Sequence, residues 1–257
     1  MEKVSGMLTC HGIDRGAHKH TALIVRHLQP LNAAARLSSF GLKHNLGIYT
    51  QSGGPATIAP LLLPEGFELS YGLDDLQLYF APGNFVQNNL VLNRKMVAQV
   101  LDWLQPQRKE QAVDLFCGIG NFSLPLAKRC KSLVGVEGGT QNVLRASANA
   151  RLNKLGNTSF YTSDLANRLA LEQQAPSWWQ AAYDIALLDP PRSGAVALTK
   201  WLSTQINKRL IYISCNPAIL AQDLTELAPY FRIARAGIID MFAHSAHCEV
   251  MCLLTRK

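Results

Sequence analysis

From about residue 111 onward, short apolar segments alternate with segments of helical periodicity. This alternation is typical of β–α–β units, in which each strand is followed by a segment that returns the chain to the same edge of a parallel sheet. The pattern therefore predicts an α/β fold built on a mainly parallel sheet. The expected strands are residues 111–117, 132–137, 158–163, 183–189 and 209–215.

Four segments carry clear helical periodicity, three within the alternating region and one ahead of it. In one of them Leu144, Ala148, Leu152 and Leu155 recur at helical spacing, and Gly156 is placed to end the helix. The predicted helices are 92–104, 121–129, 141–154 and 216–228.

The two ends of the chain differ from this pattern. The runs Ile233–Met241 and Glu249–Thr255 follow one another closely, which predicts a closing antiparallel hairpin. Ahead of the sheet, Leu23–Leu28 and Leu46–Thr50 are expected strands, and residues 67–80 are expected to form a β-hairpin. We therefore predict two domains, a small α+β segment over residues 1–82 and a catalytic domain over 83–257. The first 20 residues carry no clear pattern.

Composition narrows the class of protein. The 257 residues are 48% apolar, which suffices for a large core, and an excess of 25 Lys and Arg over 18 Asp and Glu favours polyanionic partners. No run is long enough to span a membrane, and the N-terminus lacks a secretory signal, which predicts a cytoplasmic protein. Six cysteines without a C-x-x-C pair predict neither a disulfide framework nor a metal site.

The turn after the first strand of the alternating region suits a nucleotide cofactor. Asp114 precedes Gly118 and Gly120, whose missing side chains allow close approach, but the third glycine of the dinucleotide fingerprint is absent. Glu137 ends the next strand, where an acid can accept hydrogen bonds from both ribose hydroxyls. Asp164 ends the third strand and serves equally well as an adenine contact or as a helix N-cap. Acid, glycine turn and second acid resemble the arrangement in S-adenosylmethionine-dependent methyltransferases.

Three further motifs suggest a reaction centre at the same edge of the sheet. Asp189 begins the sequence Asp-Pro-Pro-Arg after the fourth strand, a loop that suits methylation of an amino group as well as of carbon. Cys215 follows the fifth strand, where a thiolate can add to C6 of uracil and so activate C5. Glu249 begins an apolar strand, where burial raises the pKa of a carboxyl and suits it to remove the C5 proton. The simpler interpretations are a packing cysteine and a structural acid paired with an Arg or His.

These motifs, in this order, resemble the RNA uracil-C5 methyltransferase family, whose members acting on 23S ribosomal RNA are the most similar. The resemblance covers roughly residues 75–257 and implies a Rossmann-like, class I S-adenosylmethionine methyltransferase sheet. The segments that carry it are DLFCGIGNFSLPLA, LLDPPRSG, YISCNPAILAQDL and DMFAHSAHCEVMCLL.

The resemblance also implies roles for particular residues. Cys215 would be the nucleophile, Glu249 the proton acceptor, and Asp189 a contact to the base or the methyl centre. The cofactor S-adenosylmethionine would be bound around the glycine turn, by Gln87, Asp114, Phe116, Gly118, Gly120, Asn121, Glu137, Asp164 and Asp189. Gln87 lies in a polar loop that the residues alone would not single out.

Two departures from the family pattern stand out. Full-length members usually carry an N-terminal β-barrel RNA-binding domain, and many carry a cysteine cluster for a [4Fe-4S] centre. Neither has a counterpart here, so we expect a truncated or minimal member without an iron–sulfur cluster. The expected partner is RNA, with 23S rRNA preferred, and we expect a monomer with no obligate protein partner and no membrane. The alternatives are a catalytically silent RNA-binding remnant and a methyltransferase acting on an exocyclic amine.

Overall fold

The computed structural model describes residues 22–25, 47–50, 69–81, 84–87, 89–240 and 248–257, the first two segments by their backbone alone. The chain forms two compact units, one made of residues 1–72 and 79–88 and the other of residues 73–78 and 89–257. The predicted domain boundary after residue 82 stays a prediction.

The N-terminal strands are short. Strand β1 (Ala22–Val25) pairs in parallel with β2 (Gly47–Thr50). Strands β3 (Leu69–Leu73) and β4 (Leu76–Phe80) form the expected hairpin, whose turn places Asp74 at a φ of 52°. The hairpin is described from Leu69 onward, and residues 67 and 68 of the predicted hairpin lie outside the described residues.

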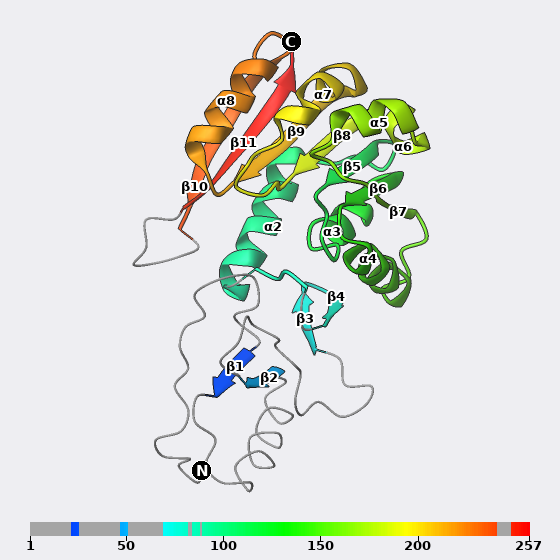
Figure 1. Ribbon diagram of the computed structural model, residues 1–257, viewed down its shortest axis with the longest axis vertical. Helices are drawn as coiled ribbons and strands as arrows, with labels where there is room; N and C mark the ends of the chain where they lie inside the picture. The colour runs from blue at the N-terminus through cyan, green and yellow to red at the C-terminus, as the bar shows by residue number, and fades with distance from the viewer. Residues whose placement is uncertain (1–21, 26–46, 51–68, 82–83, 88, 241–247) are drawn as a thin grey trace, which may run out of the picture. The chain divides into compact units, whose positions relative to one another are not determined.

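The larger unit contains a seven-stranded sheet in the order β10-β11-β9-β8-β5-β6-β7 (Figure 1). The five strands from β9 to β7 are parallel, whereas β11 runs antiparallel to both β9 and β10. The predicted α/β sheet with a closing antiparallel hairpin is thus confirmed. The strands are β5 (Gln111–Leu115), β6 (Ser132–Glu137), β7 (Thr158–Thr162), β8 (Tyr183–Leu188), β9 (Ile206–Ser214), β10 (Phe231–Ile239) and β11 (Glu249–Arg256).

Helices cover the sheet in two groups. One group contains α2, which packs against β9, β10 and α3, and the other contains α7 and α8, which pack against each other. Within the part of the chain that the structure describes, no helix is long and apolar enough to cross a membrane. The helices are α2 (Leu90–Leu104), α3 (Ser123–Ala127), α4 (Thr140–Leu152), α5 (Arg168–Gln174), α6 (Ser177–Gln180), the 3-10 helix η1 (Val196–Leu198), α7 (Thr199–Gln205) and α8 (Pro217–Leu227).

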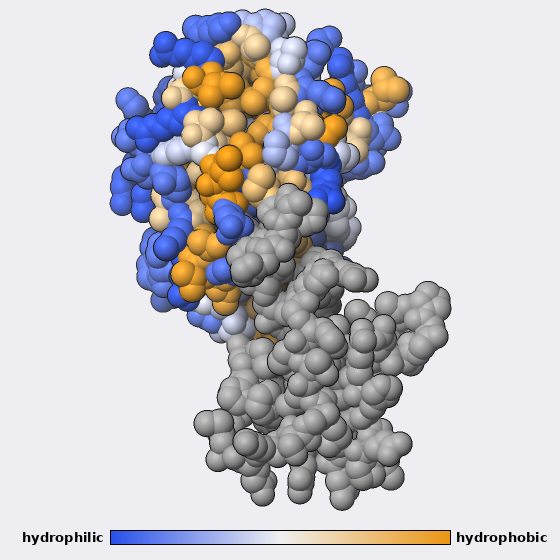
Figure 2. Space-filling model, turned by 90° about the vertical axis from the view of Figure 1, so that its left-hand side faces the viewer, coloured by the Kyte–Doolittle hydropathy of each residue, from blue (hydrophilic) through white to orange (hydrophobic). Residues whose placement is uncertain are grey.

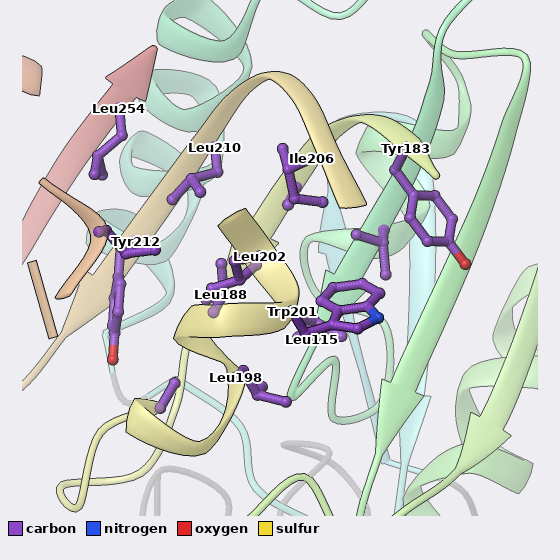
Figure 3. Packing of buried hydrophobic residues seen from close by; sticks show 14 of the residues in the cluster. Leu115, Tyr183, Leu188, Leu198, Trp201, Leu202, Ile206, Leu210, Tyr212 and Leu254 are labelled. Atoms are coloured by element: carbon purple, nitrogen blue, oxygen red, sulfur yellow. The ribbon is translucent and has the colours of Figure 1, made fainter. Parts of the chain in front are cut away.

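The main apolar core lies between one face of the sheet and helices α7 and α8. Alternate strand residues such as Leu188 and Leu210 meet Trp201 and Leu202 there (Figure 3). The intervening strand residues, such as Ile211, are buried as well. A strand buried on both faces reads as a continuous apolar run, which explains why the sequence pattern located these strands well.

Helix α4 does not bury the face that the sequence pattern indicates. Leu144 and Leu152 are 57% and 58% exposed, and the buried positions include Ala146, Asn149 and Ala150 instead. Small side chains let α4 approach the turn after β5 closely, and the Asn149 side chain donates to the Ile119 carbonyl over 3.1 Å. The close approach requires small or hydrogen-bonding side chains on the buried face of α4. The prediction that the leucine face is buried was therefore wrong.

The same helix ends without the expected glycine. Its C-cap is Asn153, and Lys154 adopts a left-handed φ of 58°, so the chain leaves the helix before Gly156. Helix α3 is also shorter than predicted, because residues 121 and 122 belong to the preceding turn.

Strand β10 forms one edge of the sheet and exposes much of its surface. Ile233 and Ile238 are 56% and 73% exposed, and Figure 2 shows hydrophobic residues gathered on this side of the unit. Arg232 and Arg235 are interspersed among them and are exposed too. Charged side chains of this kind hinder the addition of another strand to an open edge.

Glu110 directly precedes β5, at the end of the sheet where the parallel strands begin, and forms a buried ionic network with β9. Its carboxylate pairs with Arg209 at 2.9 Å and with Lys208 at 3.0 Å, and it accepts a backbone hydrogen bond from Gln107. Burial alone would raise the pKa of Glu110, but the hydrogen bonds from Arg209, Gln107 and Lys208 outweigh it and lower the pKa to about 2. Glu110, the residue before β5, is therefore tied to β9 across the intervening strand β8.

We expect Glu110→Gln to destabilise the protein by about 3 kcal/mol, because Arg209 is left without its ionic partner in a mostly buried position. Because the folded-state pKa lies below the ordinary value of 4.5, the contribution is present above that pH and is lost as the pH falls towards 2. Urea unfolding of both proteins between pH 7 and pH 3 measures this difference.

The matched control is Asp75→Asn, which removes an exposed ion pair with Lys128. This change should leave the free energy of unfolding nearly unchanged, because the pair is exposed to solvent. An equal effect of both substitutions would contradict the structural role given to Glu110.

Candidate active site

The turn after β5 has an unusual backbone. Phe116, Gly118 and Gly120 have φ values of 64°, 55° and 95°, a region that L side chains rarely adopt. A Cβ on Gly120 would lie 2.4 Å from Cδ1 of Leu124, so this position requires glycine. A Cβ on Gly118 would meet no atom within 4 Å, which means that the backbone there faces open space.

Glu137, at the end of β6, holds this turn in place. Its carboxylate accepts a hydrogen bond from the Gly118 amide at 3.2 Å, from the Gly139 amide at 2.9 Å and from the Asn142 side chain at 3.2 Å. The structure therefore brings together the glycine turn and the second acid, as the sequence predicts.

Asp114 lies beneath the turn and is fully buried. One carboxylate oxygen accepts a hydrogen bond from the Ser123 hydroxyl at the start of α3, and the other oxygen, Oδ1, has no hydrogen-bond partner. Burial raises the pKa of Asp114 to about 7, which the Ser123 hydrogen bond opposes and the nearby Glu137 reinforces. Asp114 thus supports the turn from below.

Asn121 is fixed by a residue that sequence analysis missed. Its side-chain amide and that of Asn93 on α2 donate to each other at 2.8 and 2.9 Å. Asn93 is only 1% exposed, although it lies on the apolar face of α2 with Met96 and Val97. A polar residue on that apolar stripe is the signal that could have identified it.

The remaining predicted cofactor residues lie in different surroundings. Asp164 is exposed and accepts a hydrogen bond from the Ala166 amide at 3.0 Å, while the N-cap of α5 is Asn167, so Asp164 is not the N-cap considered above. Phe116 is half-buried. Gln87 belongs to the smaller compact unit, where its side chain is buried. The roles of these residues in cofactor binding stay predictions.

The second group of predicted residues gathers where β9 ends and β11 begins. Val250 pairs with Ser214 in the antiparallel ladder, so Glu249 and Cys215 are the next residues at the same edge of the sheet. Cys215 is half-buried, whereas Glu249 is only 6% exposed. The Asn216 side chain caps α8 and also donates to the Arg192 carbonyl at 3.2 Å, which ties the loop after β8 to this edge.

The charges of this group act on one another. Burial raises the pKa of Glu249 to about 7, against an opposing effect of the Arg192 guanidinium. Burial and Glu249 also raise the pKa of the Cys215 thiol, which Arg192 lowers through a hydrogen bond and through its charge. Burial raises the pKa of Asp189 well above its ordinary value, with further contributions from Glu249 and Asp114. Three acids, a thiol and a guanidinium therefore share one partly desolvated corner.

Arg192 belongs to the Asp-Pro-Pro-Arg motif, and the motif alone does not indicate a role for its side chain. Its influence on Cys215 and Glu249 depends on side-chain packing, which spacing alone does not indicate. Over the described segments of the chain, no group of three or more His, Cys, Asp or Glu residues could hold a metal ion.

The fold and the glycine turn define the class as S-adenosylmethionine-dependent methyltransferases of class I. A Pyrococcus abyssi tRNA (uracil-54, C5)-methyltransferase, solved with S-adenosyl-L-homocysteine, is similar with a TM-score of 0.69 at 22% identity, over 91% of this chain and 55% of that chain. The M. jannaschii tRNA m1G37 methyltransferase has a TM-score of 0.63 at 11% identity, over 99% of this chain and 77% of that chain. At these identities the likeness shows the fold alone.

The sequence resolves the family within this class. Residues 72–257 match the tRNA (Uracil-5-)-methyltransferase family, and the chain belongs to this family. A curated relative from Hahella chejuensis, 23S rRNA (uracil(1939)-C(5))-methyltransferase RlmD, is 46% identical over 241 residues, which cover 91% of this chain and 54% of the relative. The chain thus spans about half the length of the curated relatives that it matches.

We expect Glu249→Gln to stabilise the protein at pH 8 by about 2–3 kcal/mol, because the buried carboxylate no longer has to ionise. The folded-state pKa of about 7 lies above the ordinary value of 4.5, so the stability associated with the protonated form is present below pH 4.5 and is lost as the pH rises through 7. Urea unfolding at pH 4.5 and pH 8 should therefore show a small difference at the lower pH and a clear gain for the variant at the higher pH. If the variant and the wild type were equally stable at pH 4.5 and also at pH 8, Glu249 would not be desolvated.

Proposed function

We propose that this chain transfers a methyl group from S-adenosylmethionine to C5 of a uridine in RNA, with 23S rRNA as the preferred substrate. The observation that carries the proposal is the placement of Glu249 next to Cys215 by the β9–β11 register, at the edge of the sheet where the parallel strands end. Membership of the family and the similarity to the Hahella chejuensis relative support this substrate.

S-adenosylmethionine, when bound, supplies an electrophilic methyl group on sulfur. In the proposal it occupies the open space in front of Gly118, with Glu137 accepting hydrogen bonds from the ribose hydroxyls. Asp164 is exposed at the end of β7, a position from which it can accept a hydrogen bond from the adenine amine. The remaining residues of the predicted cofactor set are Gln87, Asp114, Phe116, Gly120, Asn121 and Asp189.

The reaction requires a nucleophile because C5 of uracil does not attack a methyl sulfonium directly. The Cys215 thiolate adds to C6, and the electron pair of the C5–C6 double bond moves onto C5 and the adjacent carbonyl. C5 would then take the methyl group as the methyl–sulfur bond breaks, with the bonding pair left on sulfur and S-adenosylhomocysteine as the leaving group. Glu249 removes the C5 proton, the double bond re-forms, and the Cys215 thiolate leaves. The uridine has to be turned out of its stack to reach this corner.

The electrostatics of the corner suit both steps. A base with a pKa of about 7 is about half ionised at neutral pH and accepts a proton readily in its ionised form, and Glu249 has such a pKa. The Arg192 guanidinium favours the thiolate form of Cys215 against the effects of burial and of Glu249. Asp189 follows β8 between the cofactor turn and Cys215, where it can contact either the base or the methyl centre.

The proposed roles predict opposite outcomes for two substitutions. With unmodified 23S rRNA and S-adenosylmethionine, Glu249→Gln should accumulate a covalent protein–RNA complex that survives denaturation, because the methylated adduct cannot lose its C5 proton. Its turnover should fall by about 100-fold or more. Cys215→Ala should form neither the complex nor 5-methyluridine, as measured by denaturing gels and nucleoside mass spectrometry.

Cys248→Ala is the matched control, because it removes a half-buried thiol next to Glu249 that has no role in the proposal. It should keep turnover and 5-methyluridine formation. A different methylated nucleoside, formed equally by Cys215→Ala, would favour the exocyclic-amine alternative. Binding of S-adenosylhomocysteine without any product would favour a catalytically silent remnant.

We expect Gly118→Ala to weaken the binding of S-adenosylhomocysteine, because the new Cβ projects into the space assigned to the cofactor. The loss in affinity should be about tenfold, with a stability cost of about 1–2 kcal/mol for the left-handed backbone. Titration calorimetry measures the affinity. Gly156→Ala, an exposed glycine whose added Cβ also meets nothing, should bind the ligand like the wild type.

A further inference from the structure

Asp223 on α8 is a buried acid that the proposed reaction does not use. It is only 1% exposed, and its Oδ2 accepts a hydrogen bond from the Tyr212 hydroxyl and one from the Ala195 backbone amide, the latter at 2.7 Å. Tyr212 lies on β9 three residues before Cys215, and Ala195 ends the loop that begins at Asp189. One carboxylate oxygen thus connects a strand, a helix and a loop.

The packing around this carboxylate is tight. Gly194 adopts a φ of 77°, and a Cβ there would lie 2.4 Å from Cγ2 of Ile219 and 2.6 Å from Oδ2 of Asp223. The loop can therefore lie against α8 only with glycine at this position. Burying an acid here is unfavourable unless hydrogen bonds to its carboxylate offset the lost hydration. The two groups that donate these hydrogen bonds, the Ala195 amide and the Tyr212 hydroxyl, both lie outside α8.

The loop held in this way carries the charged side chains of the reaction corner. Arg192 lies three residues before Ala195. Its carbonyl accepts a hydrogen bond from the Asn216 side chain, which is a second attachment of the loop to the start of α8. The Arg192 guanidinium acts on both Cys215 and Glu249. Displacement of the Ala195 end of the loop would therefore shift the cation that favours the Cys215 thiolate.

We propose that Asp223 is a positioning residue, which fixes the loop of residues 189–195 to β9 and α8 and thereby holds Arg192 beside Cys215. This inference deepens the proposed function and rests on it for its catalytic meaning. The contact geometry itself does not depend on the identity of the substrate.

The test measures Cys215 directly, without cofactor or RNA. Iodoacetamide labelling of the full chain is followed against pH, and peptide mass spectrometry resolves Cys215 from the other cysteines. Asp223→Ala should move the midpoint of Cys215 labelling to higher pH and slow labelling at pH 7.5 about fivefold, because the thiolate loses its cation. Asp223→Asn, whose amide oxygen can still accept both hydrogen bonds, should restore most of the wild-type profile.

Leu227→Ala is the matched control for a structural role. Leu227 is fully buried on the same helix, so its truncation should destabilise the protein while leaving the Cys215 labelling profile unchanged. If Asp223→Ala does not fold, Tyr212→Phe, which removes one of the two donors, should give a smaller shift in the same direction. Methyl transfer by Asp223→Ala and Tyr212→Phe should fall in kcat with little change in KM for RNA.

An unchanged Cys215 profile in both Asp223→Ala and Tyr212→Phe would overturn the positioning role. The same profile shift in Leu227→Ala would also overturn it, because general loosening of α8 would then be the cause. If the proposed methyl transfer itself failed, Cys215 labelling would still report the loop's position, so the two failures are distinguishable.

Discussion

The antiparallel pairing of β11 with β9 is the constraint on which the reaction corner depends. Cys215 follows the last residue of β9, whereas Glu249 is the first residue of β11, so only a reversed strand can bring both to one edge. The pairing of Val250 with Ser214 fixes the register. A slip of one residue would turn Glu249 to the other face of the sheet and separate it from Cys215. The closing hairpin is therefore part of the proposed site and not merely a way to finish the sheet.

The acids at this edge of the sheet work against the stability of the fold. Asp114, Asp189 and Glu249 are acids whose pKa values burial raises, and each carboxylate makes ionisation of a neighbour less favourable. A core built for stability would not contain them. Their presence at one edge, with Arg192 opposing part of the effect, is the pattern in which perturbed pKa values mark a functional site. The Glu110 network at the other end of the strands shows the contrast, because there the cations outweigh burial and the acid is ionised.

The central strands of the large sheet were predicted well from the sequence, because burial of both faces dominates their composition. Strands buried on both faces read as apolar runs, and the glycine turn, Glu137, Cys215 and Glu249 fall at strand ends that those runs mark. The buried face of α4 could not be read in this way, because close approach to the turn selected Ala146 and Asn149 over leucine. Asn93 and Asp223 were missed because their roles depend on partners 28 residues away in the sequence. Such pairings come from tertiary packing, which local periodicity does not encode.

The loops at the active edge share one way of being held. Each is fastened to a regular element by a polar side chain: the glycine turn by Glu137 of β6, the turn residue Asn121 before α3 by Asn93 of α2, and the loop after β8 by Asp223 of α8. Loops are otherwise the most mobile parts of a fold, and a reaction that needs a thiolate, a base and a methyl donor in line tolerates errors of only a fraction of an ångström. Apolar packing cannot position a backbone amide with that precision, because it has no direction, whereas a buried hydrogen bond has one. Buried polar anchors are therefore how this fold gives the loops after its strands the fixed geometry that the proposed chemistry requires.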